Sequence, residues 1–362
     1  MKKLIFILLI INLGCSSSND LQFINRFVDG NTKLLNIINN NDIQLKLTVI
    51  DSAENFIEHE YNIDTNKYFY PASTVKLPIA LFALEKLNEN KILSIDTPFM
   101  LEDDTLKTTF KNELEKIFIL SDNQANNRFF EFTGQDYLNK KFTSKGFLNS
   151  TIFHRLSTSN SSKLKGKRVN FFTNDTIISF QNNNKEPKKL KLENIKKGKG
   201  YINSDGEMIK QEMDFSKKNY ISITDLHRIM KILFFPKKFK EEERFNLTNK
   251  QREILFNYMS GYPKDFGYNP DEFPYYFNKF FIYGDKELEF DENIIIYNKV
   301  GFAYGQLSDV AYIKKKNVSI ILTATIDVNT NKIYNDDKYD YDSIGFPFLA
   351  EISREIIKTL SN

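Results

Sequence analysis

Hydrophobic residues near both ends of the chain alternate with polar ones, whereas those in the middle recur at helical spacing. Alternation predicts a β-strand at residues 43–49, and residues 56–61 can return antiparallel after a turn to form a hairpin; further strands are predicted at 294–298, 309–313 and 318–328. Helical spacing predicts helices at 21–38 with a break at Gly30, 73–88, 222–235, 247–259 and 346–360, and a series of helices that extends to residue 145. This order predicts an α/β (α+β) fold, in which N- and C-terminal strands form an antiparallel sheet flanked by helices, with an inserted all-helical lobe.

The predicted domain begins after the first 21 residues and consists of two lobes. Residues 22–362 form it, with a sheet lobe at about 22–70 and 292–362 and a helical lobe at about 71–291. Within the helical lobe, residues 160–219 are polar and rich in Lys and Asn, which predicts a surface insertion in the form of a loop or ribbon. Contact of this insertion with a polyanion or a membrane surface is the alternative.

The composition is that of a globular chain. Of its 362 residues, 41% are hydrophobic and 27% are charged, which excludes fibrous and polytopic membrane proteins. The 50 basic and 47 acidic residues nearly cancel, so no nucleic-acid partner is expected. The histidines His59, His154 and His227 have no neighbouring Cys or His, so neither a metal site nor a cofactor is expected.

Aromatic residues supply much of the predicted core. The chain contains 33 Phe and 18 Tyr but no Trp. They are densest between Tyr262 and Tyr283, together with Pro. This segment either lines a pocket or packs beneath an irregular loop.

The first residues have the pattern of an export signal. Lys2 and Lys3 precede the apolar run Leu4–Ile11, which is too short to span a bilayer, and Cys15 follows. The pattern resembles a bacterial lipoprotein signal, which implies a signal peptide at 1–14, lipidation of Cys15 and a linker at 15–21. The protein is therefore expected to be exported and anchored in the membrane of the cell envelope. A plain secretory signal is the alternative. Because an exported chain meets no ATP or reduced nicotinamide, hydrolysis or binding is the expected activity.

A serine and a lysine share one face of the predicted helix that begins near Ser73. Ser73 and Lys76 are three positions apart, so their side chains can meet. A lysine kept from water near a helix N-terminus loses its proton readily and can act as a base for the serine hydroxyl. The pair alone is weak evidence, because Ser162 and Lys165 have the same spacing in the polar insertion.

Two further short motifs carry polar groups at suitable spacing. Ser121-Asp122-Asn123 offers a hydroxyl for proton transfer and an amide for substrate, although for this triplet alone a helix cap is the more common explanation. Lys299-Val300-Gly301 lies on a predicted strand, which could place a cation and a backbone N–H beside the serine.

Taken in order, these three motifs resemble the signature set of class A β-lactamases and penicillin-binding proteins. The predicted order of hairpin, serine helix, helical middle, lysine strand and terminal helix is also similar to that of this family. The resemblance implies that Ser73 is the acylated nucleophile, Lys76 its base or proton relay and Ser121 the proton donor to the leaving nitrogen. It also implies that Asn123 binds the substrate's amide and that Lys299 holds the substrate carboxylate or tunes Ser121.

The lysine strand would complete the site that the resemblance implies. Gly301 and Phe302 would bind substrate on this strand, with an oxyanion hole formed by the backbone N–H groups of Ser73 and Phe302. Val300 departs from the family pattern, because this position usually carries a hydroxyl that donates to the substrate carboxylate. The gap from Ser73 to Ser121 is shorter than usual in the family, and that from Ser121 to Lys299 is longer.

The sharpest departure concerns deacylation. Class A enzymes use a glutamate on a loop after the middle motif, whereas this chain has no carboxylate between Asp136 and Asp175. An acyl-enzyme on Ser73 could therefore be long-lived. His154 is a candidate substitute base, but a histidine beside Arg155 is more often structural or exposed.

Three hypotheses for function remain at this point. The first is an exported serine hydrolase that opens β-lactams. The second keeps the nucleophile but acts on a cell-wall peptide ending in D-alanine, or on another amide or ester. The third is a lipid-anchored binding protein on a degenerate enzyme fold. A monomer is expected in each case.

Overall fold

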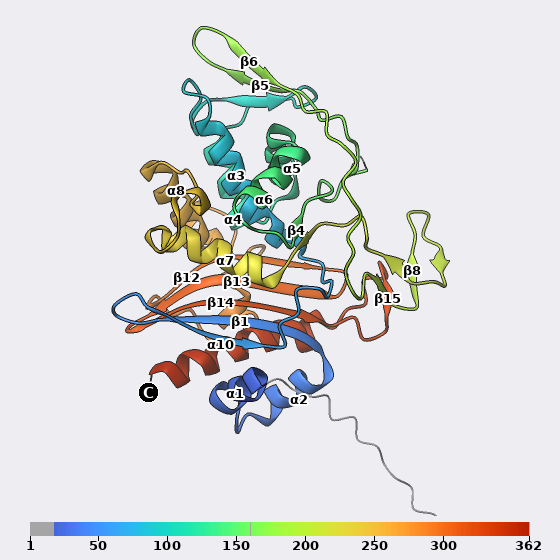
Figure 1. Cartoon of the computed structure of the whole chain (residues 1–362), viewed down its shortest axis with the longest axis vertical. Helices are drawn as coiled ribbons and strands as arrows, with labels where there is room; N and C mark the ends of the chain where they lie inside the picture. Colours follow the sequence, from blue (N-terminus) through green and yellow to red (C-terminus); the bar gives the residue numbers. More distant parts are fainter. Residues whose placement is uncertain (1–17, 160, 362) are drawn as a thin grey trace, which may run out of the picture.

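The computed structural model describes residues 18–159 and 161–361, and its centre is a five-stranded antiparallel sheet (Figure 1). The strand order is β12-β13-β14-β1-β2, so strands from the two ends of the chain pair side by side. Their bounds are β1 Asp42–Ile50, β2 Phe56–Tyr61, β12 Ile294–Ala303, β13 Gln306–Lys315 and β14 Val318–Asp327. The predicted fold class, an antiparallel sheet flanked by helices, is confirmed.

Helices cover both faces of this sheet. The helices α1 and α10 contact one another, and Figure 1 shows them with α2 on the side opposite the helical lobe. The helices α7 and α8 contact the sheet from the other side. Their bounds are α1 Ser18–Phe27, α2 Thr32–Asn40, α7 Ile223–Phe234, α8 Asn249–Ser260 and α10 Phe346–Ser361. Strand β14 is buried from Ile320 to Ala324 because it lies between the two helical layers.

The N-terminal helix divides where the sequence predicted a break. Gly30 has φ +83°, a conformation that glycine adopts without strain, and it lies between α1 and α2. Residues 18–21, expected to belong to a linker, form the first turn of α1. The predicted signal peptide 1–14 and Cys15 lie outside the described residues. No helix in the described ranges is long and apolar enough to cross a membrane.

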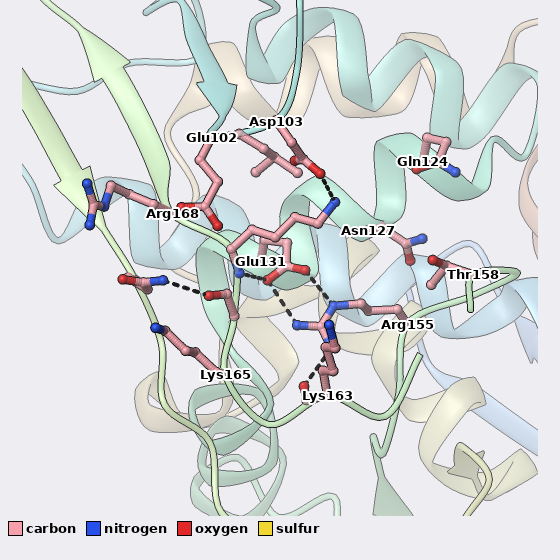
Figure 2. A pocket seen from close by; sticks show the side chains of 14 residues that line it. Glu102, Asp103, Gln124, Asn127, Glu131, Arg155, Thr158, Lys163, Lys165 and Arg168 are labelled. Carbon is pink, nitrogen blue, oxygen red and sulfur yellow. Dashed lines mark hydrogen bonds and ion pairs between the residues drawn. The ribbon is translucent and has the colours of Figure 1, made fainter. Parts of the chain in front are cut away.

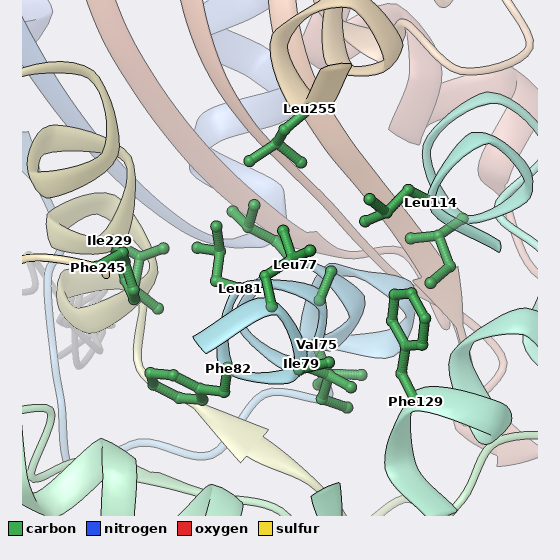
Figure 3. Close-up of a cluster of buried hydrophobic side chains, with 14 of the residues drawn as sticks. Val75, Leu77, Ile79, Leu81, Phe82, Leu114, Phe129, Ile229, Phe245 and Leu255 are labelled. Carbon is green, nitrogen blue, oxygen red and sulfur yellow. The ribbon is translucent and has the colours of Figure 1, made fainter. Parts of the chain in front are cut away.

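The helical lobe is built around α3 (Figure 3). Its helices are α3 Lys76–Asn88, α4 Phe110–Ile119, α5 Asn123–Thr133 and α6 Gln135–Ser144, and a four-residue kinked segment, α9 Phe280–Tyr283, leads back toward the sheet. Every residue from Lys76 to Glu85 is buried, as expected for a helix that is packed on all sides. Leu77, Leu81 and Phe82 contribute to the same hydrophobic cluster as Phe129. This packing fixes the N-terminal end of α3.

The prediction of an all-helical lobe needs a correction, because the lobe also carries short strands. They are β3 Phe99–Leu101, β4 Ser150–Thr151, β5 Val169–Phe172, β6 Ile177–Phe180, β7 Lys196–Lys197, β8 Gly200–Ile202, β9 Met208–Ile209, β10 Met213–Asp214 and β11 Tyr220–Ile221, and β15 Ile333–Tyr334 joins β8 from outside the lobe. In β5, Val169 and Phe171 are fully buried, and Phe171 stacks on Phe99 at 5.2 Å between ring centroids. The insertion at 160–219 is therefore a ribbon of which part belongs to the hydrophobic core.

Candidate active site

Ser73 lies in a tight turn directly before α3. Residues Ala72–Val75 form one turn of 3-10 helix, so the single helix predicted from residue 73 has a different first turn. Thr74 ties this turn down, because its N–H and its hydroxyl both donate to the Pro71 carbonyl, at 3.0 and 2.6 Å. Ala72 has φ +46°, a strained conformation for a residue with a side chain. The turn leaves Ser73 half-buried at the edge of a cleft.

Lys76, the first residue of α3, is fully buried beside Ser121. Its Nζ donates to the Ser121 carbonyl and lies 3.3 Å from Ser121 Oγ. Burial lowers the pKa of Lys76 to about 7, although the nearby Asp122 carboxylate acts in the opposite direction. Near neutral pH a large fraction of Lys76 is therefore a free amine that can accept a proton.

Ser121 lies at the turn between α4 and α5 and has φ +55°. Such strain is found where surrounding contacts hold a residue in place, and it is common at functional sites. The next residue, Asp122, is the N-cap of α5 and accepts the Ala125 N–H at 2.7 Å. The helix-cap interpretation of this triplet thus applies to Asp122, while Ser121 and Asn123 line the cleft.

Lys299 on β12 reaches the same hydroxyl from the sheet. Its side chain is buried, and its Nζ donates to Ser121 Oγ at 2.7 Å and to the Val300 carbonyl at 3.0 Å. Burial, together with the proximity of Lys76, holds the pKa of Lys299 well below its usual value. Two buried amines therefore share one hydroxyl, an arrangement suited to moving a proton between them.

A buried polar network that no sequence motif indicated lies behind Lys299. Lys279 is fully buried, and its Nζ donates to the Met259 carbonyl at 3.0 Å and to Asn298 Oδ1 at 2.8 Å. Asn298 in turn donates to the Asp309 carboxylate at 2.9 Å. Burial lowers the pKa of Lys279 to about 7 and raises that of Asp309 to about 6. These groups lie on three separate segments, so only the tertiary structure brings them together.

The close approach of β12 to the turn that holds Ser73 explains why residue 301 is glycine. A Cβ at Gly301 would lie 2.7 Å from the Ser73 nitrogen and 2.8 Å from both the Pro71 oxygen and the Thr74 nitrogen. All three atoms belong to the backbone and cannot move aside as a flexible side chain would. Strand β12 thus contacts the serine turn backbone to backbone.

The hairpin after β12 sets the direction of the Phe302 N–H. Ala303 pairs with Gln306 across a two-residue turn, in which Tyr304 and Gly305 have φ +57° and +75°. In such hairpins the closing pair is hydrogen-bonded and the next pair is not. The N–H of Phe302 therefore points away from β13, toward the open edge of the sheet beside Ser73. Ser73 and Phe302 line the same cleft, and an oxyanion hole formed by their N–H groups stays a prediction.

The cleft has two compartments that meet at Ser73, Asn123 and Phe302. The first, of about 390 Å³, is called here the aromatic compartment; it is lined by Ser121 and Val300 and by Tyr276, Phe277, Phe280 and Phe346. The second, of about 300 Å³, is called the polar compartment; it is lined by Tyr70, His154, Ser157, Thr158, Ser161, Lys218 and Tyr304. Part of the segment 262–283 therefore lines a pocket, while Tyr262 and Tyr283 pack in the core.

The loop that borders the polar compartment presents a hydroxyl to Asn123. Asn123 Nδ2 donates to Ser157 Oγ at 2.9 Å, and Ser157 has φ +46°. Asn127 fixes this loop by accepting the Leu156 N–H at 2.9 Å and donating to its carbonyl at 2.8 Å. None of the described residues that line the polar compartment is a carboxylate.

Arg155 anchors the same loop through an ion pair with Glu131 (Figure 2). Its guanidinium donates to both oxygens of Glu131, at 2.5 and 3.0 Å, and both side chains are at most 5% exposed. The pair lines a neighbouring pocket of about 570 Å³ whose rim carries the exposed residues Lys163, Lys165 and Arg168. A buried, bidentate ion pair holds the loop rigidly.

The histidine that sequence analysis considered as a base has both ring nitrogens engaged. His154 Nδ1 lies 2.6 Å from the Arg155 carbonyl, and its Nε2 accepts the Asn219 N–H at 3.4 Å. Burial lowers the pKa of His154 to about 4, so the ring is neutral near pH 7. With a neutral ring that donates through Nδ1, the Nε2 lone pair faces Asn219 rather than the cleft. The structural interpretation of His154 is the one that this geometry favours.

Comparison with known proteins places this site in a family. The family model described as "Beta-lactamase enzyme family" matches residues 31–360. The chain therefore belongs to the β-lactamase enzyme family, and this membership supports a serine hydrolase. No curated protein matches the sequence.

Solved structures show the same fold at low sequence identity. The class A β-lactamase from Bacteroides cellulosilyticus is 12% identical, with a TM-score of 0.56 over 96% of this chain and 100% of that one. The extended-spectrum β-lactamase TLA-1 is 14% identical, with a TM-score of 0.56 over 91% and 97%. The structure of PBP-A is also 14% identical, with a TM-score of 0.55 over 95% and 96%.

Proposed function

We propose that this protein is a serine hydrolase that opens β-lactam amide bonds by acylation of Ser73 and releases the acyl group slowly. The observation that carries the proposal is the meeting of Lys76 and Lys299 at Ser121 Oγ, at 3.3 and 2.7 Å, beside the turn that holds Ser73. Family membership over residues 31–360 supports the same chemistry.

Each polar group of the site has a defined role in the proposed acylation. Ser73 Oγ attacks the carbonyl carbon of the amide, and its proton passes to the free amine of Lys76. The N–H groups of Ser73 and Phe302 stabilise the oxyanion of the tetrahedral intermediate. When the carbon–nitrogen bond breaks, Ser121 Oγ–H donates a proton to the leaving nitrogen and regains one from a neighbouring ammonium. Asn123 would hold the amide of the acyl side chain.

Slow release follows from the lining of the polar compartment. Hydrolysis of the ester on Ser73 requires a water molecule and a base that removes its proton. Ser157 contacts Asn123 in the polar compartment, at the position where such a base would act, but its hydroxyl is not a base near neutral pH. His154 is neutral but has no nitrogen directed at the cleft.

A second candidate, favoured by the same lack of a carboxylate, is a peptidase-like hydrolase of the cell envelope. In that case the acyl donor is a cell-wall peptide ending in D-alanine, or another amide or ester, and an amine rather than water could accept the acyl group. The nucleophile and its amines would keep their roles.

Intact-protein mass spectrometry with a penicillin tests both candidates. The protein lacking residues 1–15 is mixed with millimolar benzylpenicillin, alongside Ser73→Ala, while loss of the β-lactam is followed in time. We expect a long-lived adduct on the native protein, slow substrate loss, and neither in the variant. Adduct formation or hydrolysis that survives in Ser73→Ala would contradict the assignment.

The binding-protein hypothesis makes the opposite prediction for a general serine probe. A fluorophosphonate acylates activated serines without needing the right acyl side chain. Labelling of the native protein and not of Ser73→Ala supports an enzyme. Failure of every such probe would favour a binding protein on a degenerate enzyme fold.

Export and lipid anchoring form a separate part of the proposal, supported by the pattern from Lys2 to Cys15. In a bacterial host, the full chain should incorporate radiolabelled palmitate and sediment with membranes. Cys15→Ala should lose the label. If the native chain takes up no label, the anchor proposal fails and a plain secretory signal is left.

A further inference from the structure

We propose that Lys218 binds a carboxylate in the acyl group of the substrate, so that the enzyme prefers acyl donors with a negative charge on this side of the scissile bond. The inference rests on the proposed acylation of Ser73 and names the chemistry of the acyl half. The substrate would then be a β-lactam with an acidic side chain or, for the second candidate function, an acidic peptide.

The position of Ser121 indicates which compartment receives the acyl group. Ser121 Oγ contacts both buried amines, so it is the hydroxyl that can protonate a departing nitrogen. Ser121 lines the aromatic compartment and not the polar one. The leaving group therefore faces the aromatic compartment, and the acyl group extends past Asn123 into the polar compartment.

Lys218 is held at the polar compartment by the loop between β10 and β11. Its backbone N–H donates to the carbonyl of Phe215, a fully buried residue, at 2.9 Å. The next residue, Asn219, is 1% exposed; its side chain accepts the Phe153 N–H at 2.7 Å and donates to the His154 carbonyl at 3.1 Å. Lys218 thus belongs to a fixed part of the insertion, and its half-buried side chain lines the compartment.

The charge of Lys218 is not compensated by a carboxylate. Its Nζ donates to the Tyr304 hydroxyl at 3.4 Å and lies 5.6 Å from the centre of the same ring. Within residues 18–159 and 161–361, Lys218 forms no ion pair. A half-buried ammonium has lost part of its hydration, and an anion that approaches it is attracted more strongly than it would be in bulk water.

The other basic groups of the polar compartment do not compete for an added anion. Arg155 already contacts both oxygens of Glu131 and donates to the Lys163 carbonyl at 2.8 Å. His154 is neutral near pH 7, because burial above all, and also the charge of Lys218, lower its pKa to about 4. Lys218 is therefore the cation with which a carboxylate in this compartment would pair.

Hydroxyl groups in the same compartment can complete a carboxylate site. Ser157, Thr158 and Ser161 line it from the loop after His154. A carboxylate accepts several hydrogen bonds, and those from a charged donor are the strongest. With a volume of about 300 Å³, the compartment has room for a short acidic side chain.

Two pairs of penicillins test the inference, because the members of each pair differ by one carboxylate in the acyl side chain. Carbenicillin is benzylpenicillin with a carboxylate on the side-chain α-carbon. In adipoyl penicillin a carboxylate replaces the terminal methyl group of hexanoyl penicillin. Acylation rates of Ser73 are measured by mass spectrometry under identical conditions, and we expect the carboxylated member to react about fivefold faster in at least one pair. Equal rates in both pairs, or faster reaction of the uncharged members, would overturn the inference.

Lys218→Met provides the matched variant, because it keeps most of the side-chain volume and removes the charge. We expect the ratio of rates within the favoured pair to fall to about one, and Lys218→Glu to reverse the preference. Lys217→Met is the control and should keep the native ratio, since Lys217 is exposed, lies 3.7 Å from Glu186 and does not line the compartment. A preference that survives in Lys218→Met would mean that another group binds the carboxylate, and the inference would be wrong.

Salt and the serine variant separate the remaining explanations. Salt screens a half-buried ion pair, so the preference should weaken as the salt concentration rises to about 1 M. A preference that is independent of salt would contradict an ion pair with Lys218. If no penicillin forms an adduct that depends on Ser73, the proposed function itself fails. Adducts that depend on Ser73 but form at equal rates within both pairs refute only the carboxylate preference proposed here.

Discussion

Lys299 Nζ lies 2.7 Å from Ser121 Oγ, although the two residues are 178 positions apart in the sequence. Lys76 reaches the same residue from α3, 45 positions before it. One hydroxyl is thus held between two buried amines that come from the sheet and from the helical lobe. The site therefore forms only when both lobes are folded and in contact.

The pKa of Lys76 predicts how acylation depends on pH. Burial lowers this pKa to about 7, and only the deprotonated amine can accept the proton of Ser73. The acylation rate should therefore rise with pH, reach half of its maximum near pH 7 and level off above it. Stopped-flow acylation between pH 5 and 9 measures the profile. Lys76→Met should lose at least 100-fold in rate, and a flat profile in the native protein would exclude Lys76 as the base.

Gly301→Ala should impair the active site without unfolding the protein. The added Cβ would lie 2.7 to 2.8 Å from three backbone atoms of the serine turn, so the turn or strand β12 must shift. We expect acylation to fall at least 100-fold while the circular dichroism spectrum is kept. Gly206→Ala is the control: Gly206 has φ +81° and open space around it, so stability should drop by about 1 kcal/mol with acylation unchanged. Full activity in Gly301→Ala would contradict the geometry.

Ser157→Glu should restore a base for deacylation. The new carboxylate would lie beside Asn123, which already donates to Ser157 Oγ at 2.9 Å. General-base assistance is worth about 10²- to 10⁴-fold, so we expect the adduct with benzylpenicillin to be lost at least tenfold faster. Ser162→Glu, an exposed position that does not line the polar compartment, controls for the added charge. Equal adduct lifetimes in both variants would show that the missing carboxylate does not limit release.

A double-mutant cycle should show a coupling energy between Lys279 and Asp309 in the buried network behind Lys299. Lys279→Met removes the donor to Asn298 and leaves Asp309 buried without this nearby cation, which should lower the free energy of unfolding by about 3 kcal/mol. Adding Asp309→Asn should recover part of that loss, because no charge is then left uncompensated. Urea denaturation of the four proteins measures the coupling. Strictly additive losses would mean that the two groups do not interact.

The sequence predicted the elements of the fold better than it predicted their packing. Alternation located β1, in which Ile43, Leu45 and Leu47 are buried, and the hairpin and strand signals located β2 and the three C-terminal strands. The short strands of the insertion were missed, since β7, β9 and β10 are only two residues long, too short for a periodic pattern, and form only by pairing with one another or with β8. Phe171 in β5 looked like part of a polar ribbon, but contact with Phe99 buries it.

What the sequence by itself determined is the set of groups that could carry the chemistry. Ser73 and Lys76 are three positions apart, so local helical geometry predicts that their side chains share a face, and the order of the three motifs indicated the family. Only the tertiary structure decided that Ser121 is shared by two amines, that Gly301 touches the serine turn and that Lys279, Asn298 and Asp309 form one network. The physical reason is that burial and long-range contact set the pKa of a lysine and the direction of a backbone N–H, and neither quantity is local in the chain.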